Sequence, residues 1–281
     1  MRLYRNYDSP GELELASAFR AVTTTIPSSH PSGVITAWDQ VAGHLYIAGD
    51  MDYVRVWDAH RELSQMDIPT QADACVTSLS VEEDTESTFV AGFGDGSVRL
   101  YDKRCAPNEA LARTFRKHRT WVQDVTMQLG GHSMVSSSLD GEACIWDFRH
   151  TTDPVSEVTF QKRGSSNVAT HASAPFSASV SNAFVDGTTR QRWQRLSVHY
   201  VGGGQGGQRC RKVTELGMPV LTPPGQGVGG KRREYAPWGN ALAFHPKEMM
   251  VAVGGLDSTV KVWRPEFDKW SYQTDDRYGG E

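Results

Sequence analysis

Four variants of one short string, spread along the 281-residue chain, constrain its fold more than any other feature. The first three close on an aromatic residue, and these aromatic residues lie 44 and 45 residues apart. Each string follows a turn rich in Gly and Asp, and two further short β-type segments precede that turn. Fourth strands are expected at 63–68, 111–115 and 155–160. The strings are YVRVWD at 53–58, SVRLYD at 97–102, EACIWD at 142–147 and TVKVW at 259–263.

A period of about 40–45 residues with four short strands is typical of WD repeats, in which each repeat forms one blade of a β-propeller. A single blade has two apolar faces, and only neighbouring blades can cover both. The pattern therefore predicts an all-β WD-repeat propeller with about five recognisable blades, including a weak one at 167–184. We expect the N-terminal extension, 1–30, to contain one strand, which could complete a three-stranded last blade. Predicted boundaries are 31–185 for the first blades, 236–270 for the last and 271–281 for a tail.

The resemblance to WD repeats also implies a buried hydrogen-bond network that holds the tight turn of a blade. In the third repeat the network would join His118, a serine such as Ser138, Asp140 and Trp146. Buried polar groups must be paired, so these side chains are predicted to be structural rather than catalytic. Related packing or turn positions in the other repeats are Trp57, Asp95, Tyr101, Asp257 and Trp263.

Residues 186–235 interrupt the repeats. Ten of the 30 residues from 201 to 230 are glycine, and residues 190–235 carry nine basic and two acidic side chains. Such a composition buries little apolar surface, so we predict an irregular, disordered insert or an error in the gene model. Two G-x-G-x-x-G matches lie here, at 202–207 and 225–230, but neither leads into an amphipathic helix. No cofactor is predicted.

Composition excludes several other classes. The formal net charge of −4 argues against a dedicated nucleic-acid-binding protein. No run approaches the roughly 18 apolar residues of a membrane-spanning helix. The four cysteines lie 30, 39 and 66 residues apart, which is no zinc-binding pattern, so no metal site is expected. Without a secretion signal they are predicted to be reduced, in a cytosolic or nuclear protein.

Three stretches are more specific than a generic WD repeat, at 54–80, 90–104 and 115–149. With ALAFHPKEMMVAVG near the C-terminus, they resemble the C-terminal WD-repeat propeller of the Raptor family, regulatory subunits of TOR complex 1. The resemblance is close over 13–160 and 238–263. It implies a seven-bladed propeller that follows a helical-repeat domain and a caspase-like domain.

The resemblance to Raptor implies a non-catalytic scaffold that acts in nutrient-responsive TOR signalling. Implied partners are the TOR kinase and other TOR complex 1 subunits or substrates. The implied location is cytoplasmic, or peripheral at the lysosomal or vacuolar surface through the complex. Two alternatives come from other classes. One is a substrate receptor of a ubiquitin ligase with a basic face for phosphodegrons, and the other is an enzyme that uses His118 and Asp140.

Overall fold

In the computed structural model, every described element is a β-strand apart from one 3-10 turn, η1 (Pro107–Glu109). Within this described part, no helix is long and apolar enough to cross a membrane. Structural statements below concern the described residues alone. These are 1–6, 11–20, 25–26, 31–82, 87–128, 132–149, 153–159, 165–171, 173–174, 176–181, 184–185, 192–202, 209–219, 239–245, 247–255 and 260–264.

The first three repeats fold into four-stranded antiparallel sheets, which we call blades 1, 2 and 3. All three predicted fourth strands are present. Blade 1 contains β3 (Val34–Asp39), β4 (His44–Gly49), β5 (Tyr53–Asp58) and β6 (Leu63–Pro69). Blade 2 contains β7 (Val76–Val81), β8 (Thr88–Phe93), β9 (Ser97–Asp102) and β10 (Leu111–Arg116). Blade 3 contains β11 (Val122–Met127), β12 (Ser133–Ser138), β13 (Glu142–Asp147) and β14 (Ser156–Thr159).

Two further sheets bring the number of described blades to the predicted five. Blade 5 has three strands, as expected for the last repeat. Blade 4 contains β15 (Ser165–Thr170), β16 (Phe176–Ser181), β17 (Phe184–Val185), β18 (Arg192–Gly202) and β19 (Arg209–Pro219). Blade 5 contains β20 (Gly239–Phe244), β21 (Val251–Gly255) and β22 (Val260–Trp263).

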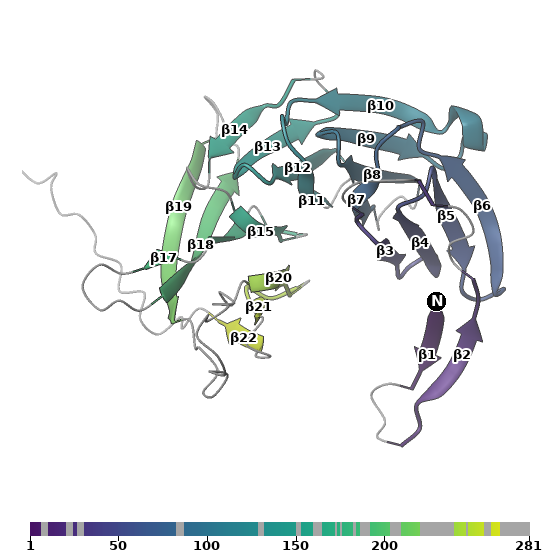
Figure 1. The fold of residues 1–281 in the computed structure, drawn as a ribbon, viewed down its shortest axis with the longest axis horizontal. Coiled ribbons are helices and arrows are strands. Elements are labelled where there is room, and N and C mark those ends of the chain that lie inside the picture. The colour runs from purple at the N-terminus through teal and green to yellow at the C-terminus, as the bar shows by residue number, and fades with distance from the viewer. Residues whose placement is uncertain are drawn as a thin grey trace, which may run out of the picture.

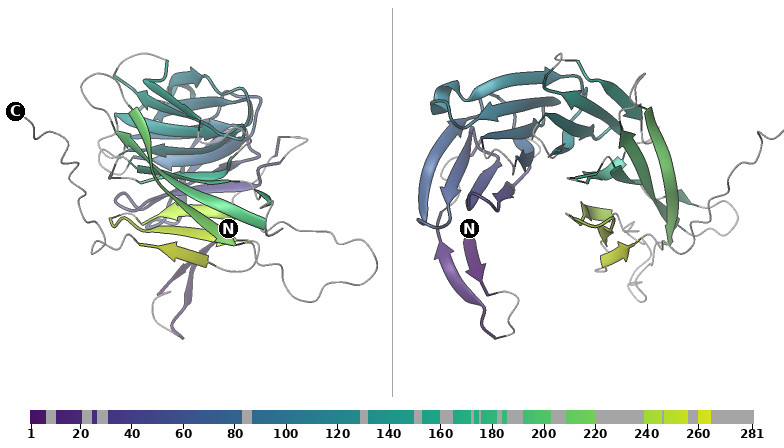
Figure 2. Two further views of the ribbon diagram at one scale, coloured as in Figure 1. Left: turned by 90° about the vertical axis from the view of Figure 1, so that its left-hand side faces the viewer. Right: turned by 180° about the vertical axis from the view of Figure 1, so that it is seen from behind.

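The five blades form an open arc rather than a closed ring (Figures 1 and 2). Their first strands line the inside of the arc, where β3 packs on β7, β7 on β11, β11 on β15 and β15 on β20. Large apolar side chains fill the contact between blades 1 and 2, including Tyr46, Phe89 and Tyr101. Phe115 and Trp146 belong to the core between blades 2 and 3.

The N-terminal extension differs from the prediction, because it contains two strands instead of one. β1 (Arg2–Arg5) pairs with β2 (Glu14–Ala18), so β2 does not complete the last blade. The hairpin covers the face of blade 1 that blade 2 leaves open. Leu3 and Phe19 pack there, and the Phe19 ring stacks on Trp57 with centroids 3.8 Å apart. Burial of this apolar face explains the different position of the strand.

The predicted irregular insert also differs, because β18 and β19 form a long hairpin on β16. Leu196 of β18 is fully buried and packs with Val251 and Val253 of blade 5. The high average glycine content of 186–235 obscured the apolar residues that alternate along β18, such as Leu196 and Val198. The glycine-rich stretches 203–208 and 220–238 lie outside the described residues.

Four inner strands share a β-bulge near their start, which a period of two could not predict. The pairing register shifts between Val76 and Ser78 in blade 2 and between Val122 and Asp124 in blade 3. β15 and β20 have the same shift one residue after they begin. A bulge leaves one residue unpaired and turns its side chain in a new direction. Thr77 and Gln123 are these extra residues in blades 2 and 3.

Candidate protein-interaction surface

Blade 3 contains a buried polar network around Ser136, which has no exposed surface. The indole N–H of Trp146 donates a hydrogen bond to Ser136 Oγ at 2.8 Å. The Ser136 hydroxyl also lies 2.7 Å from His118 Nε2. Because the Ser136 hydroxyl oxygen accepts a hydrogen bond from the Trp146 indole, the hydroxyl can donate its own hydrogen to His118 Nε2. Burial lowers the pKa of His118, which favours the neutral ring that this arrangement needs.

Ser138 and Asp140 form a second, separate group at the turn of blade 3. The Ser138 hydroxyl donates to the Asp140 carboxylate, and the backbone N–H of Glu142 lies 3.3 Å from the same oxygen. The predicted serine therefore holds the turn, while Ser136 makes the bridge between His118 and Trp146. His118 Nδ1 is buried without a hydrogen-bond partner in the described part of the chain.

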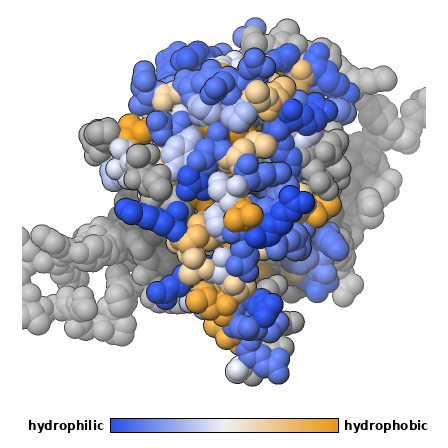
Figure 3. Space-filling view, turned by 90° about the vertical axis from the view of Figure 1, so that its right-hand side faces the viewer, coloured by the Kyte–Doolittle hydropathy of each residue, from blue (hydrophilic) through white to orange (hydrophobic). Residues whose placement is uncertain are grey.

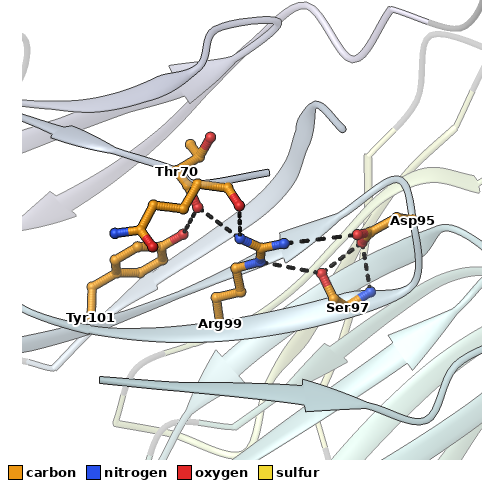
Figure 4. A network of polar contacts seen from close by, with 6 residues as sticks. Thr70, Asp95, Ser97, Arg99 and Tyr101 are labelled. Carbon is orange, nitrogen blue, oxygen red and sulfur yellow. Dashed lines mark hydrogen bonds and ion pairs between the residues drawn. The ribbon is translucent and has the colours of Figure 1, made fainter. Parts of the chain in front are cut away.

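Blade 2 holds the corresponding turn with different side chains (Figure 4). Asp95 accepts hydrogen bonds from the Ser97 backbone N–H and hydroxyl at 2.8 and 2.6 Å. The buried guanidinium of Arg99 lies 4.0 Å from Asp95 and donates to the Thr70 carbonyl at 2.9 Å. The Tyr101 hydroxyl donates to the same carbonyl at 2.8 Å. Of these five residues, Asp95 and Tyr101 were predicted from the sequence, whereas Thr70, Ser97 and Arg99 were not.

The remaining predicted positions are spread over the arc. Trp57 is half-buried on blade 1 under Phe19, and its indole nitrogen is buried with no hydrogen-bond partner in the described part of the chain. Trp263 ends β22 and packs with the core between blades 4 and 5. Asp257 lies outside the described residues. Those predicted site residues that the structure describes do not form one site. They occupy separate blade turns and cores.

The described residues form no cluster able to hold a metal ion. Among the cysteine side chains that the structure describes, those of Cys75 and Cys144 are buried and that of Cys105 is exposed. Burial raises the pKa of Cys144 to about 12, which keeps it a thiol. Ser136 and His118 are also buried, so a substrate could not reach the hydroxyl. This position favours a structural network over the alternative of catalysis by His118 and Asp140.

A depression of about 250 Å³ opens where the inner strands of blades 1, 2 and 3 begin. The bulged residues Thr77 and Gln123 both line it, and Leu139 on its wall is 54% exposed. None of the predicted site residues lines this depression, and its sequence signal is the apolar Leu139 directly before the turn residue Asp140. The lining residues are Ser32, Ile35, Thr77, Trp121, Val122, Gln123 and Leu139.

Carboxylates gather at this end of the blades. We define the strand-start end as the turns and loops 31–33, 50–52, 70–75, 94–96, 117–121 and 139–141, which contain five aspartates and two basic residues. One of the two, Lys117, pairs with Glu157 at 2.7 Å. The aspartates are Asp50, Asp52, Asp73, Asp95 and Asp140.

At the opposite end of blades 1, 2 and 3, carboxylates are paired with arginines instead. The aspartate that ends each third strand binds an arginine two or three residues later. The pairs are Asp58–Arg61 at 3.6 Å, Asp102–Arg104 at 2.6 Å and Asp147–Arg149 at 2.8 Å. The two ends of the blades therefore present different charge to a partner.

The outer side of blades 1 and 2 is largely hydrophilic, and apolar residues gather toward the N-terminal hairpin (Figure 3). Tyr4, Leu13 and Leu15 are 47%, 60% and 50% exposed there. Together, the blades, the tight-turn networks and these surfaces define a WD40-repeat propeller chain, a class that presents surfaces to other proteins. The WD40 family (WD domain, G-beta repeat) matches residues 109–147 and 240–264.

Comparison with individual known proteins gives a more specific similarity than the WD40 family match. Target of rapamycin complex 1 subunit KOG1 of Saccharomyces cerevisiae is 30% identical over 97% of this chain and 18% of that protein. Regulatory-associated protein of TOR 1 of Arabidopsis thaliana is 27% identical over 94% of this chain and 18% of that protein. The crystal structure of Chaetomium thermophilum Raptor matches with a TM-score of 0.73 and 30% identity, over 94% of this chain and 21% of that one.

The chain is therefore a homologue of the Raptor and KOG1 proteins in their WD40-repeat region, and the predicted resemblance is confirmed. It spans about a fifth of the length of these relatives.

Proposed function

We propose that this chain is a non-catalytic protein-interaction scaffold in TOR complex 1 signalling, and that its partners are the TOR kinase and other subunits or substrates of that complex. One observation carries the proposal. Nearly the whole chain aligns with a subunit that is named for TOR complex 1, and it shares the fold of Raptor at 30% identity. The proposed location is cytoplasmic, or at the lysosomal or vacuolar surface through the complex.

The surface charge bears on the alternative of a phosphodegron receptor. Recognition of phosphorylated peptides requires clustered Arg or Lys side chains that are free to bind phosphate. At the described strand-start end, aspartates outnumber basic residues by five to two. At the opposite end, one arginine in each of blades 1, 2 and 3 is already paired with an aspartate. Both features favour a partner other than a phosphopeptide.

Co-purification with the TOR kinase tests the proposal. The tagged chain should be joined to the N-terminal portion of a Raptor relative and expressed in cells, and kinase recovery should be compared with that of the same portion alone. We expect the chain to increase recovery. Equal recovery with and without the chain would show that these blades do not serve the complex. A Leu63→Ser variant, altered at an exposed position, provides a matched control and should behave like the unaltered chain.

A further inference from the structure

The depression at the strand-start end has the size and lining of a side-chain pocket. Ile35, Trp121, Val122 and Leu139 supply apolar walls to a volume of about 250 Å³. Ligand pockets for small metabolites usually hold about 300–1,000 Å³, so this volume suits one large side chain better than a whole metabolite. An exposed apolar residue such as Leu139, 54% accessible, gains from being covered by a partner.

Two bulged residues line the pocket. Thr77 and Gln123 are the extra residues at the register shifts of β7 and β11, and bulges commonly redirect side chains beside binding sites. The Thr77 hydroxyl is buried and makes no hydrogen bond to any described residue. The pocket lining is therefore mostly apolar at its accessible surface, with Ser32, Thr77 and Gln123 as its polar members.

Aspartates surround this pocket. Asp140 follows Leu139, whose backbone N–H donates to the Trp121 carbonyl at 3.0 Å. The turn of Asp95 packs against the loop that carries Trp121, since a Cβ on Gly94 would lie 3.8 Å from the indole. On the blade 1 side, Asp50 accepts hydrogen bonds from Ser32 of the pocket lining at 2.8 and 3.1 Å. The Asp95 carboxylate is already paired with Arg99, so the negative charge available to a partner comes from Asp140 and Asp50 on two sides of the pocket.

We propose that this pocket docks a linear segment of a partner protein in which one large apolar side chain is flanked by lysine or arginine. The apolar side chain occupies the space between Trp121 and Leu139, and the flanking cations lie near the aspartates. Burial of the apolar side chain provides affinity, whereas charge complementarity selects the segment and speeds its association. The proposal rests on the proposed scaffold function and names the chemistry of one partner contact.

Short fluorescein-labelled peptides test this inference on the full 281-residue chain by fluorescence anisotropy. The probes are Lys-Arg-Leu-Arg-Lys, the same peptide with glycine for leucine, and Glu-Glu-Leu-Glu-Glu. We expect the first peptide to bind roughly tenfold more tightly than either of the others, as loss of a buried leucine side chain or reversal of charge predicts. Added salt should weaken the binding, because the flanking contacts are exposed.

Leu139→Ser locates the binding site, and Leu63→Ser makes the same change at an exposed leucine at the opposite end of blade 1. We expect Leu139→Ser to weaken binding of Lys-Arg-Leu-Arg-Lys about fivefold or more, and Leu63→Ser to leave it unchanged. Equal binding of all three peptides, or equal effects of the two substitutions, would overturn the inference. If the pocket inference fails in this way but the chain still co-purifies with the TOR kinase, the scaffold function is retained. If the peptide binds but the chain does not co-purify, the scaffold function is rejected and the pocket inference is retained.

Discussion

Blades 2 and 3 link the loop before their first strand to their third strand with different chemistry. In blade 3, His118 lies in the loop before the first strand, which we call the leading loop. It is linked through Ser136 to Trp146 of the third strand. The positions that match His118 and Ser136 in blade 2 are Ala72 and Ala91, which cannot form this bridge. Arg99 and Tyr101 of the third strand instead bond to a backbone carbonyl of the leading loop, that of Thr70.

The difference shows what a repeat preserves. Both blades tie their leading loop to their third strand, and both use an aspartate in the turn between the second and third strands. In blade 3 the loop contributes a side chain, so the network is visible in the sequence. In blade 2 the loop contributes only carbonyl oxygens, which every residue has. The structural link remains although its sequence signature is gone.

The largest expected effect is that of Trp146→Ala in blade 3. Trp146 is 1% exposed and its ring lies 5.0 Å from that of Phe115. Removal of a buried aromatic side chain leaves a cavity and should lower the free energy of unfolding by about 3–5 kcal/mol. Urea denaturation followed by circular dichroism measures this loss. Trp38→Ala, at a tryptophan that is 41% exposed, is the matched control and should cost less than about 1 kcal/mol. Equal losses for the two variants would contradict the role given to Trp146.

Arg99→Met tests the network of blade 2. The substitution keeps much of the apolar stem but leaves the Gln71 carbonyl without its donor and the Thr70 carbonyl with the Tyr101 hydroxyl alone. Hydrogen bonds to a charged group are worth about 1.5–3 kcal/mol, so we expect a loss near 3 kcal/mol in the same denaturation assay.

The matched control for Arg99 is Arg61→Met, because Arg61 belongs to an exposed ion pair with a side chain that is 81% accessible. Exposed pairs contribute about 0–1 kcal/mol, so this variant should stay near the stability of the unaltered chain. If Arg99→Met cost no more than Arg61→Met, blade 2 would not depend on its carbonyl contacts and the comparison with blade 3 would fail.

His118→Ala should cost about 2 kcal/mol, somewhat less than loss of Arg99, because a neutral side chain leaves fewer buried groups unpaired. A double-mutant cycle with Ser136→Ala sharpens the comparison. Both residues act through one hydroxyl, so the double variant should lose clearly less than the sum of the two single losses. Additive losses would show that His118 and Ser136 stabilise the blade independently. The alternative of catalysis by His118 predicts no loss of stability at all.

Much of this fold could be predicted from the sequence. The closing aromatic residues at regular spacing indicated the blades, and alternation placed the fourth strands 63–68 and 111–115 close to β6 and β10. The bulges at Thr77 and Gln123 could not be predicted, because one extra residue leaves the apolar pattern of a strand nearly unchanged. Since these bulges shape the pocket, the candidate surface was missed with them.

The errors have a common cause, which is that tertiary contacts decide between local alternatives. The N-terminal extension 1–30 was expected to contain one strand and contains β2, yet the partner of β2 is β1 because Phe19 can then stack on Trp57. Leu196 is buried in a tract whose average composition suggests disorder, because blade 5 offers it an apolar face. In both contacts the partner residue lies far away in the sequence, so the local pattern does not reveal it.

The contact between blades 2 and 3 gives the last prediction. Asp124 of β11 accepts a hydrogen bond from Ser78 of β7 at 3.1 Å, and the Ser78 hydroxyl accepts from the Val125 N–H at 3.0 Å. Burial raises the pKa of Asp124 to about 7 from its ordinary value of 3.8. The folded chain therefore binds this proton more tightly than the unfolded chain. The resulting stability is fully present below pH 3.8 and is lost as pH rises through about 7.

Asp124→Asn removes this titration while it keeps an oxygen that can accept from Ser78. A tenfold change in proton affinity corresponds to about 1.4 kcal/mol, and solvent screens part of this at the half-buried Asp124. We therefore expect the variant to gain about 1–2 kcal/mol on the unaltered chain between pH 4 and pH 8. Urea midpoints measured across that range give the result. A constant difference between the two chains at every pH would mean that Asp124 does not couple the blade contact to protons. A gain that grows with pH would show that blades 2 and 3 are joined by a proton-linked contact, in addition to the separate networks that hold each of their turns.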